Sequence, residues 1–191
     1  CGTGTITEIL QNVSGAAVIG LEPDEERATR ARERGLNVIN AYLSPEIIRE
    51  HGLFDFVLFA DVLEHLPNPA QDVCLARDGL APGGSVLASV PNGAHLFARL
   101  DLLRGIIRYE DAGIMDATHL RWFTRHSIRQ FFERLNFEVI YQSHTVFTGM
   151  HMYSTRKPFC WMRPNMRSRV LRRLSEWRPG LFAVQHIIQA V

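Results

Sequence analysis

The chain has 191 residues, of which 46% are hydrophobic, enough for one globular domain with a buried core. Its 21 basic and 20 acidic residues give a formal net charge of +1, so no overall field favours nucleic acid as a partner. The three cysteines lack paired spacing, which disfavours a disulfide framework or a zinc site. No apolar run approaches the length of a membrane span and no signal peptide opens the chain. We therefore expect a cytoplasmic protein with no nucleic-acid partner.

The first half of the chain alternates helix-like runs with short apolar runs. A helix over 5–12 is expected directly after the opening glycines, with Ile6, Ile9 and Leu10 on one face. The next expected elements are a strand over 16–21, a helix over 24–34, a strand over 36–39, a helix over 45–51, a strand over 54–60, a helix over 69–80, a turn over 81–84 and a strand over 85–90. Strands and helices that alternate through short connections are typical of a doubly wound parallel α/β sheet.

After Asn92 this alternation ends. The remaining expected elements are a helix over 94–105, a loop-rich stretch over 106–124, a helix over 125–135, a strand over 137–146 and a final strand over 181–191. The last two strands are separated by an insertion, 148–180, whose basic residues greatly outnumber its single acid, Glu176. We interpret residues 1–191 as one domain that carries this basic insertion.

The opening turn and the end of the second apolar run together indicate a nucleoside cofactor. Gly2 and Gly4 open a helix, and glycines let backbone N–H groups approach a ligand closely. Glu22 follows about 20 residues later at a predicted strand end, the spacing at which a carboxylate reaches ribose hydroxyls. Each signal alone is equally typical of an ordinary turn or a solvated charge. A nicotinamide oxidoreductase is disfavoured because Thr7 stands where a dinucleotide fingerprint has its third glycine.

The most apolar predicted strand ends in the segment FADVLEHLPNP. Ligands of open α/β sheets lie beyond the carboxyl ends of the strands, so Ala60 and Asp61 are expected in the crevice. Asp61, Glu64 and His65 have the i, i+3, i+4 spacing that can present two carboxylates and an imidazole to a divalent metal. Because such triplets more often cap and solvate a turn, we assign no metal ligand.

These segments resemble a known family. CGTGT, LEPD, FDFVLFADVLEHLPNP and LAPGGSVLASVPN are similar, as a set, to the signature segments of class I S-adenosylmethionine-dependent methyltransferases. PNGAHLFARLDLLRG, YEDAGIMDATHLRWFT and LFAVQHIIQA resemble a narrower bacterial subgroup often found in cell-surface polysaccharide gene clusters. Ubiquinone-pathway O-methyltransferases share the EHL-type segment. The methionine-biosynthesis MetW-like proteins resemble the 91–105 stretch and usually lack an EHL.

The resemblance implies a Rossmann-like sheet, mostly parallel with an antiparallel last strand, that binds S-adenosylmethionine. Gly2 and Gly4 would line the methionine portion and Glu22 would bind the ribose diol. The other residues in the implied cofactor set are Cys1 and Pro23 beside these motifs, Ala41 and Tyr42 at the adenine, and Ala60 and Asp61 near the reactive end. The chain departs from the family in two places. The strand that precedes the glycine turn is missing, so we expect an N-terminal truncation, and Ala41 stands where an Asp is common.

Methyl transfer needs orientation more than covalent help, and a general base is required only for a hydroxyl or a protonated amine. His119 in DATHLRWFT is the candidate base, and the alternative is that it pins the loop to backbone. His95 is more typical of a helix cap. We predict O-methylation of a sugar, a glycolipid or another small molecule. A non-catalytic binding or regulatory protein, MetW-like or decayed, is the alternative function.

The basic insertion allows two interpretations. Val170, Leu171, Leu174 and Trp177 have helical spacing beneath many arginines. A basic amphipathic helix can lie on an anionic membrane surface, giving peripheral membrane contact, or grip a phosphate of a lipid-linked glycan. The more ordinary interpretation is a solvated flap with a few packing residues.

Overall fold

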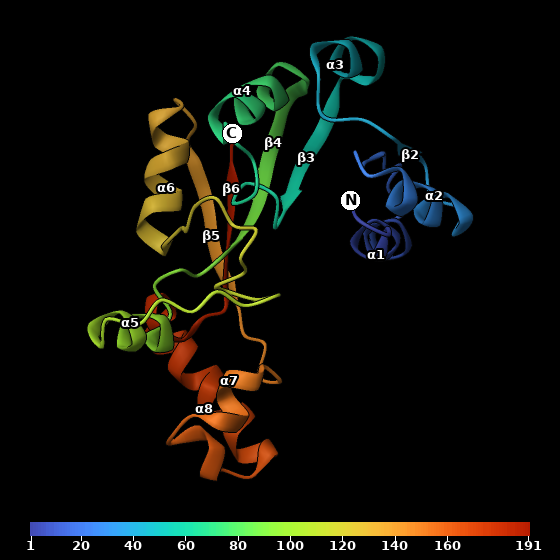
Figure 1. The fold of residues 1–191 in the computed structure, drawn as a ribbon. Helices are drawn as coiled ribbons and strands as arrows, with labels where there is room; N and C mark the ends of the chain where they lie inside the picture. The colour runs from blue at the N-terminus through green and yellow to red at the C-terminus, as the bar shows by residue number, and fades with distance from the viewer. The chain divides into compact units, whose positions relative to one another are not determined.

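The computed structural model describes residues 1–191 as two compact units, Cys1–Leu53 and Phe54–Val191 (Figure 1). The first unit contains α1 (Thr5–Ser14), β1 (Gly20–Leu21), α2 (Glu25–Glu33), β2 (Val38–Ile39) and α3 (Pro45–His51). β1 and β2 are parallel neighbours, with Gly20 opposite Val38. The core of this unit is small and is formed by Ala28, Ala31, Leu36 and Val38.

The helices of the first unit begin and end where local chemistry predicts. The Asp24 carboxylate accepts a hydrogen bond from the Arg27 N–H at 2.9 Å and caps α2. Gly35, with φ of +78°, follows that helix in the left-handed conformation that glycine adopts easily. The strands are shorter than the expected 16–21 and 36–39, because only two residues of each are paired.

The second unit is built on a four-stranded sheet in the order β3-β4-β6-β5 (Figure 1). The bounds are β3 (Phe54–Ala60), β4 (Leu80–Pro91), β5 (Val139–Thr145) and β6 (Gln185–Ala190). β3 and β4 are parallel, whereas β6 runs antiparallel to both β4 and β5. The predicted mostly parallel Rossmann-like sheet with an antiparallel last strand is therefore confirmed.

Three helices accompany this sheet. The turn predicted over 81–84 is not a separate turn, because these residues are part of β4. The helices are α4 (Pro69–Asp78), α5 (Leu96–Leu103) and α6 (Arg125–Arg134). The expected turn over 81–84 belongs instead to the first half of β4, because Leu80 pairs with Phe54 before the register shifts and Ser85 pairs with Phe56. Gly83, with φ of +83°, absorbs the irregularity.

The segment between β5 and β6 folds into helices that lie beyond the carboxyl end of β4 (Figure 1). They are α7 (His151–Thr155), a 3-10 helix (Phe159–Trp161), α8 (Pro164–Trp177) and α9 (Pro179–Phe182). Leu181 and Phe182 belong to α9, so the final strand, β6, is shorter than the expected 181–191. No helix of the structure combines the length and the apolar character needed to cross a bilayer.

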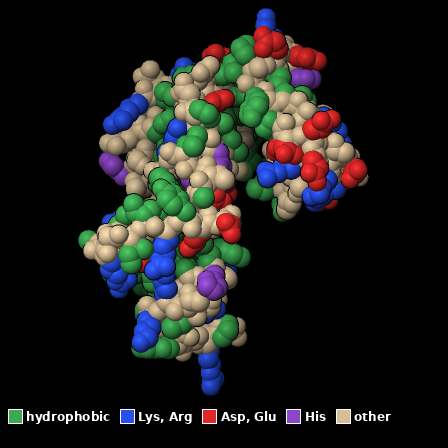
Figure 2. Space-filling view, viewed as in Figure 1, with side chains coloured by type: hydrophobic (Ala, Val, Ile, Leu, Met, Phe, Trp, Pro, Cys, Tyr) green, Lys and Arg blue, Asp and Glu red, His purple; other side chains and the backbone are tan.

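Burial within the insertion bears on both interpretations of it. Leu171 is fully buried, and Val170 and Leu174 pack against the same cluster, so these residues form a core rather than a membrane-facing stripe or a loose flap. Trp177 is 69% exposed. On the face drawn in Figure 2, the basic side chains of this part are scattered and do not gather into one patch. Peripheral membrane contact stays a prediction that the buried residues do not support.

Candidate functional site

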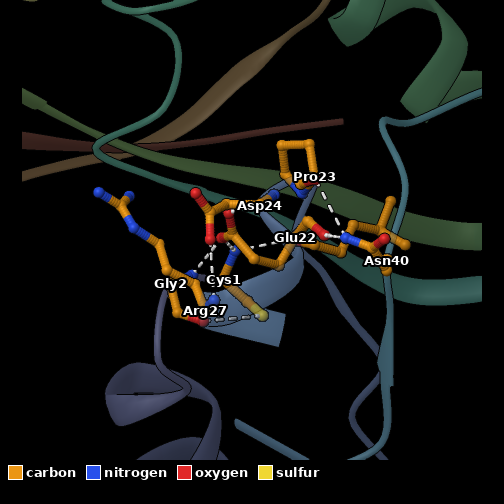
Figure 3. Close-up of polar contacts among 8 residues, drawn as sticks. Cys1, Gly2, Glu22, Pro23, Asp24, Arg27 and Asn40 are labelled. Atoms are coloured by element: carbon orange, nitrogen blue, oxygen red, sulfur yellow. Dashed lines mark hydrogen bonds and ion pairs between the residues drawn. The ribbon is translucent and has the colours of Figure 1, made fainter. Parts of the chain in front are cut away.

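The glycine turn and Glu22 meet within the first unit. The Gly2 N–H donates to one oxygen of the Glu22 carboxylate at 2.6 Å, and the Asp24 N–H donates to the other at 3.2 Å (Figure 3). The chain-terminal ammonium of Cys1 lies 3.0 Å from the same oxygen as Gly2. β1 ends directly before Glu22, so the parallel pair β1–β2 delivers this carboxylate to the turn. The predicted proximity of Glu22 to the glycines is present.

Glu22 is buried and remains charged. Burial alone raises the pKa of a carboxyl group, but hydrogen bonds from the terminal ammonium, Gly2 and Asp24 outweigh it and lower the pKa of Glu22. The backbone N–H groups of Gly2 and Asp24 engage two of the roughly four lone-pair sites of this carboxylate. Capacity remains for a further donor, such as a ribose hydroxyl.

The two glycines play different parts. A Cβ on Gly2, which has φ of +60°, would meet nothing within 4 Å, so this side of the turn is open. A Cβ on Gly4, with φ of +85°, would clash with Leu36 Cδ1 and lie 3.2 Å from Ala31 Cβ. Gly4 is therefore required where the turn packs against α2 and the segment after it, and only Gly2 faces open space.

The end of β2 is held by a residue that sequence reasoning missed. The Asn40 side-chain amide donates to the carbonyls of Glu22 and Pro23, at 2.9 and 3.0 Å (Figure 3). Asn40 thereby ties the ends of the two strands together. The following Tyr42 is 71% exposed, and the Ala41 N–H bonds back to the Ile39 carbonyl at 3.1 Å. An Asn directly after an apolar strand was the available signal.

In the second unit, Asp61 follows β3 with a strained backbone and a bound carboxylate. Its φ is +51°, in the left-handed region that side chains rarely adopt. The Ser89 hydroxyl donates to one carboxylate oxygen at 3.2 Å, and the Gln185 amide donates to the other at 2.5 Å. Burial raises the pKa of Asp61 although both hydrogen bonds lower it. Sequence reasoning missed Ser89 and Gln185, which lie on neighbouring strands and reach Asp61 only through sheet pairing.

The two motif segments of this unit are joined along their length. The Leu120 N–H donates to the Glu64 carbonyl at 2.9 Å, and the Arg121 guanidinium donates to the Pro67 carbonyl at 3.0 Å. His65 Nδ1 lies 3.3 Å from the Thr118 carbonyl. These contacts hold the DATHLRW loop against the EHLPNP turn and fix the positions of both histidines between them.

His119 is 8% exposed and is bound on one side only. Its Nδ1 lies 3.3 Å from the Ile114 carbonyl oxygen, which accepts a hydrogen bond from the protonated Nδ1. This contact favours the tautomer whose Nε2 is an unprotonated acceptor. Burial, followed by the neighbouring His65, lowers the pKa of His119, although Asp116 and Asp61 raise it. The two alternatives for His119, a base or a pin to backbone, are compatible because they use different nitrogens.

Glu64 stands out because it is 1% exposed and neither carboxylate oxygen has a hydrogen-bond partner. Burial raises the pKa of Glu64 to about 8, and the carboxylates of Asp61 and Asp116 add to this effect. Ligand-type atoms of Glu64, His65 and His119 lie within 4.8 Å of one another. These atoms could hold a cation, but a protonated Glu64 carboxyl group beside two imidazoles would account for the same arrangement without one. Asp61 is not in this trio.

His95 is structural. It is 1% exposed, its Nδ1 accepts from the Phe97 N–H at 3.3 Å as a helix cap of α5, and its Nε2 lies 2.8 Å from the Tyr153 hydroxyl. Burial lowers the pKa of His95 to about 4, so the ring is neutral at physiological pH. The helix-cap interpretation is confirmed.

Asp61, Glu64, His65 and His119 line one small cavity of about 220 Å³. Its remaining lining residues are Pro91, Gly113, Ile114, Asp116, Val184 and Gln185. A cavity with three carboxyl groups and two imidazoles can accept, hold or return a proton from a small polar group.

Comparisons with known proteins agree with this fold. A ubiquinone biosynthesis O-methyltransferase of Methylococcus capsulatus is 36% identical over 98 residues, which is 48% of this chain and 41% of that protein. The corresponding protein of Nitrosococcus oceani is 36% identical over 107 residues, covering 51% of this chain and 45% of that protein. The chain thus spans less than half the length of these relatives.

Solved structures resemble the whole chain at low sequence identity. An S-adenosylmethionine-dependent methyltransferase from Archaeoglobus fulgidus superposes with a TM-score of 0.66 at 16% identity, covering all of this chain and 82% of that one. The magnesium protoporphyrin IX methyltransferase of Synechocystis, solved with bound S-adenosylhomocysteine, gives 0.58 at 16% identity, covering all of this chain and 70% of that one. The methyltransferase domain family model matches residues 1–142. By that match the chain belongs to the methyltransferase domain family.

Proposed function

We propose that this protein is an S-adenosylmethionine-dependent methyltransferase that methylates an oxygen of a sugar, a glycolipid or another small molecule. The observation that carries the cofactor assignment is the 2.6 Å hydrogen bond that joins the Gly2 N–H to the Glu22 carboxylate. This bond holds the Glu22 carboxylate, which can accept hydrogen bonds from hydroxyl groups, beside an open backbone turn. The pair suits a ribose diol that lies next to the methionine portion of the cofactor. The ubiquinone-pathway relatives, O-methyltransferases by name, support oxygen as the methylated atom.

The residues present fit the cofactor. Gly2 leaves open space where a side chain would stand, and Glu22 keeps capacity for one further donor. We assign the ribose to Glu22 and the methionine portion to Gly2, with Cys1 and Pro23 beside them. The adenine contacts of Ala41 and Tyr42, and the contacts of Ala60 and Asp61, stay predictions. S-adenosylmethionine supplies a methyl group on a sulfonium, which is already a strong electrophile.

His119 is the proposed general base. Its Nε2 is the unprotonated nitrogen of a ring whose Nδ1 is bound to the Ile114 carbonyl. Nε2 can therefore take the proton of an acceptor hydroxyl as its oxygen bonds to the methyl carbon, the carbon–sulfur bond breaks and S-adenosylhomocysteine leaves. Glu64 lies beside it in the same cavity and can hold a proton at neutral pH. Orientation of the acceptor by this cavity contributes the larger part of the acceleration.

Calorimetric titration of the protein with S-adenosylhomocysteine tests the cofactor assignment. Glu22→Ala removes the ribose acceptor, and loss of a charge-assisted hydrogen bond should weaken binding by about 1–3 kcal/mol. Glu26→Ala is the matched control, because Glu26 is an exposed acid of the same unit that pairs only with Arg30. Equal affinity of the Glu22 variant and the parent, with both folded by circular dichroism, removes Glu22 from the ribose role. No binding by the parent, also when the gene supplies residues before Cys1, favours the non-catalytic alternative.

A further inference from the structure

A second, larger cavity lies in the same unit as His119. Its volume is about 690 Å³, within the range of small-molecule sites. The apolar part of its wall is formed by Val146, Phe147, Met150, Met152 and Val184. Methionine side chains are flexible and polarisable, so they adapt to apolar ligands of different shape. Glu110, Thr145, His151 and Thr155 also line the cavity, but most of its exposed surface is apolar, which suits a hydrocarbon better than a free sugar.

The two cavities share part of their lining. Gly113, Val184 and Gln185 belong to both. Gln185 also donates its amide to Asp61 at 2.5 Å, so the residue between the cavities is anchored at the polar end. A ligand that occupies both would place an apolar body among the methionines and a polar group near His119 and Glu64.

The outer rim continues the apolar character. Phe147 lines the large cavity and is 64% exposed. Arg156, also in the lining, is held by Asp101 at 2.6 Å and lies over the Phe97 ring, so its charge is already paired. The cavity therefore presents no free cation that would demand an anionic ligand at this point.

We propose that the 690 Å³ cavity binds the hydrocarbon body of the methyl acceptor, which makes the acceptor an amphipathic molecule with a hydroxyl on an apolar chain or ring. This inference rests on the proposed methyltransferase function and narrows its substrate class. A free monosaccharide would leave the methionine-lined cavity empty and gain nothing from it. A glycolipid or a hydrophobic phenol would fill both cavities.

The test uses n-alkyl β-glucosides of increasing chain length as probes, below their micelle concentrations, titrated into the protein saturated with S-adenosylhomocysteine. Affinity should rise by up to about fourfold per added methylene while the chain enters the cavity, and glucose alone should not bind. Equal affinity for short and long chains, or for glucose, overturns the proposal. Binding of S-adenosylhomocysteine in the same sample shows separately whether the methyltransferase function stands.

A pair of variants locates the binding. Met150→Gln keeps the side-chain volume but places an amide in the apolar wall, and should weaken octyl glucoside binding roughly three- to tenfold. Leu103→Gln makes the same kind of change at an 83% exposed residue of α5 outside the cavity, and should leave binding unchanged. Equal loss in both variants indicates surface adsorption of the detergent and contradicts the proposal. Thermal melting of both variants confirms that they are folded.

Discussion

At the scale of single residues, the catalytic hypothesis rests on His119, because one of its ring nitrogens binds the backbone and the other is free to accept a proton. Nδ1 binds the Ile114 carbonyl, and Nε2 has no partner that the protein supplies. Asn can imitate the Nδ1 donor of a histidine but has nothing in place of Nε2. This difference allows the pinning role and the proton-accepting role to be measured apart.

With an acceptor that turns over, His119→Asn and His119→Ala should both lower kcat by roughly 10²–10⁴-fold, with cofactor affinity unchanged. Only His119→Ala should also lower thermal stability, because it removes the hydrogen bond to Ile114. The readouts are steady-state kinetics across pH and a melting curve for each variant. Protonation of a catalytic His119 would produce an acid-side limb in the pH profile of kcat, because its pKa is lowered. An Asn variant that keeps both the activity and this limb rules out catalysis by His119.

Glu64 predicts a dependence of stability on pH. Its folded pKa is raised from 4.5 to about 8, so the folded state binds more protons than the unfolded state between these values. The contribution of Glu64 to the free energy of unfolding is therefore fully present below about pH 4.5, and it is lost as pH rises through about 8. Between pH 6.5 and 8.5 the parent should lose about 2 kcal/mol relative to Glu64→Gln, which cannot ionise.

Urea unfolding of both proteins at several pH values checks this prediction. The buried histidines His95 and His186, whose pKa values burial lowers to about 4, titrate below this window and act in the opposite direction. The other titratable groups that line the cavity with Glu64 are Asp61, Asp116, His65 and His119, and they are unchanged in the variant. Parallel stability curves for the two proteins would show that Glu64 ionises normally.

At the scale of elements, the glycine turn joins α1 to the rest of the first unit by two different constraints. Gly2→Ala introduces a side chain at positive φ into open space and should cost about 1 kcal/mol of unfolding free energy. Gly4→Ala adds a clash with Leu36 and should cost roughly 2–4 kcal/mol. Urea unfolding followed by circular dichroism measures both. Equal costs would mean that Leu36 yields to the new methyl group.

The paired elements of the second unit show how a site is assembled from distant parts of the chain. Ser89 lies opposite Ala60 across β3–β4, and Gln185 begins β6 opposite Pro91. Both reach Asp61 only because the strands pair in this register. A shift of one residue would turn these side chains to the other face of the sheet.

At the scale of the whole molecule, the four-stranded sheet has two edge strands, β3 and β5, each paired on one side only. β3 pairs only with β4, and its Phe56 and Leu58 are 62% and 40% exposed. In the first unit, β1 pairs only with β2, and Ile9 of α1 is 55% exposed. Unpaired strands with exposed apolar side chains are liable to pair with a further strand, which keeps the predicted strand before the glycine turn open to test.

Hydrogen exchange provides that test. If the gene supplies further residues before Cys1, the longer protein should exchange the outward-pointing amides of β3 at least tenfold more slowly than the chain of 191 residues. β5 is the control, because it is the other edge of the same sheet and pairs only with β6. Equal exchange of β3 in the two proteins would mean that no added strand covers this edge.

Local pattern was sufficient for most of the secondary structure and for the class of fold. α3 and β3 have the predicted bounds, since Pro45 begins one and a continuous apolar run defines the other. β1 and β2 are shorter than their apolar runs, because a strand ends where its partner ends, and the partner is not local information. The same limit explains why the turn over 81–84 joined β4 through its pairing with Phe54.

The amino-acid sequence by itself determined the alternation of elements, the glycine turn with Glu22 one strand later, and the polar segments around Asp61 and His119. These follow from the periodicity, conformational freedom and spacing of neighbouring residues. Only the tertiary structure decided that Glu64 is buried without a partner, that His119 is bound at Nδ1, and that Leu171 of the basic helix is core. Burial and hydrogen-bond partners depend on residues far apart in the chain, so only the packed fold specifies them.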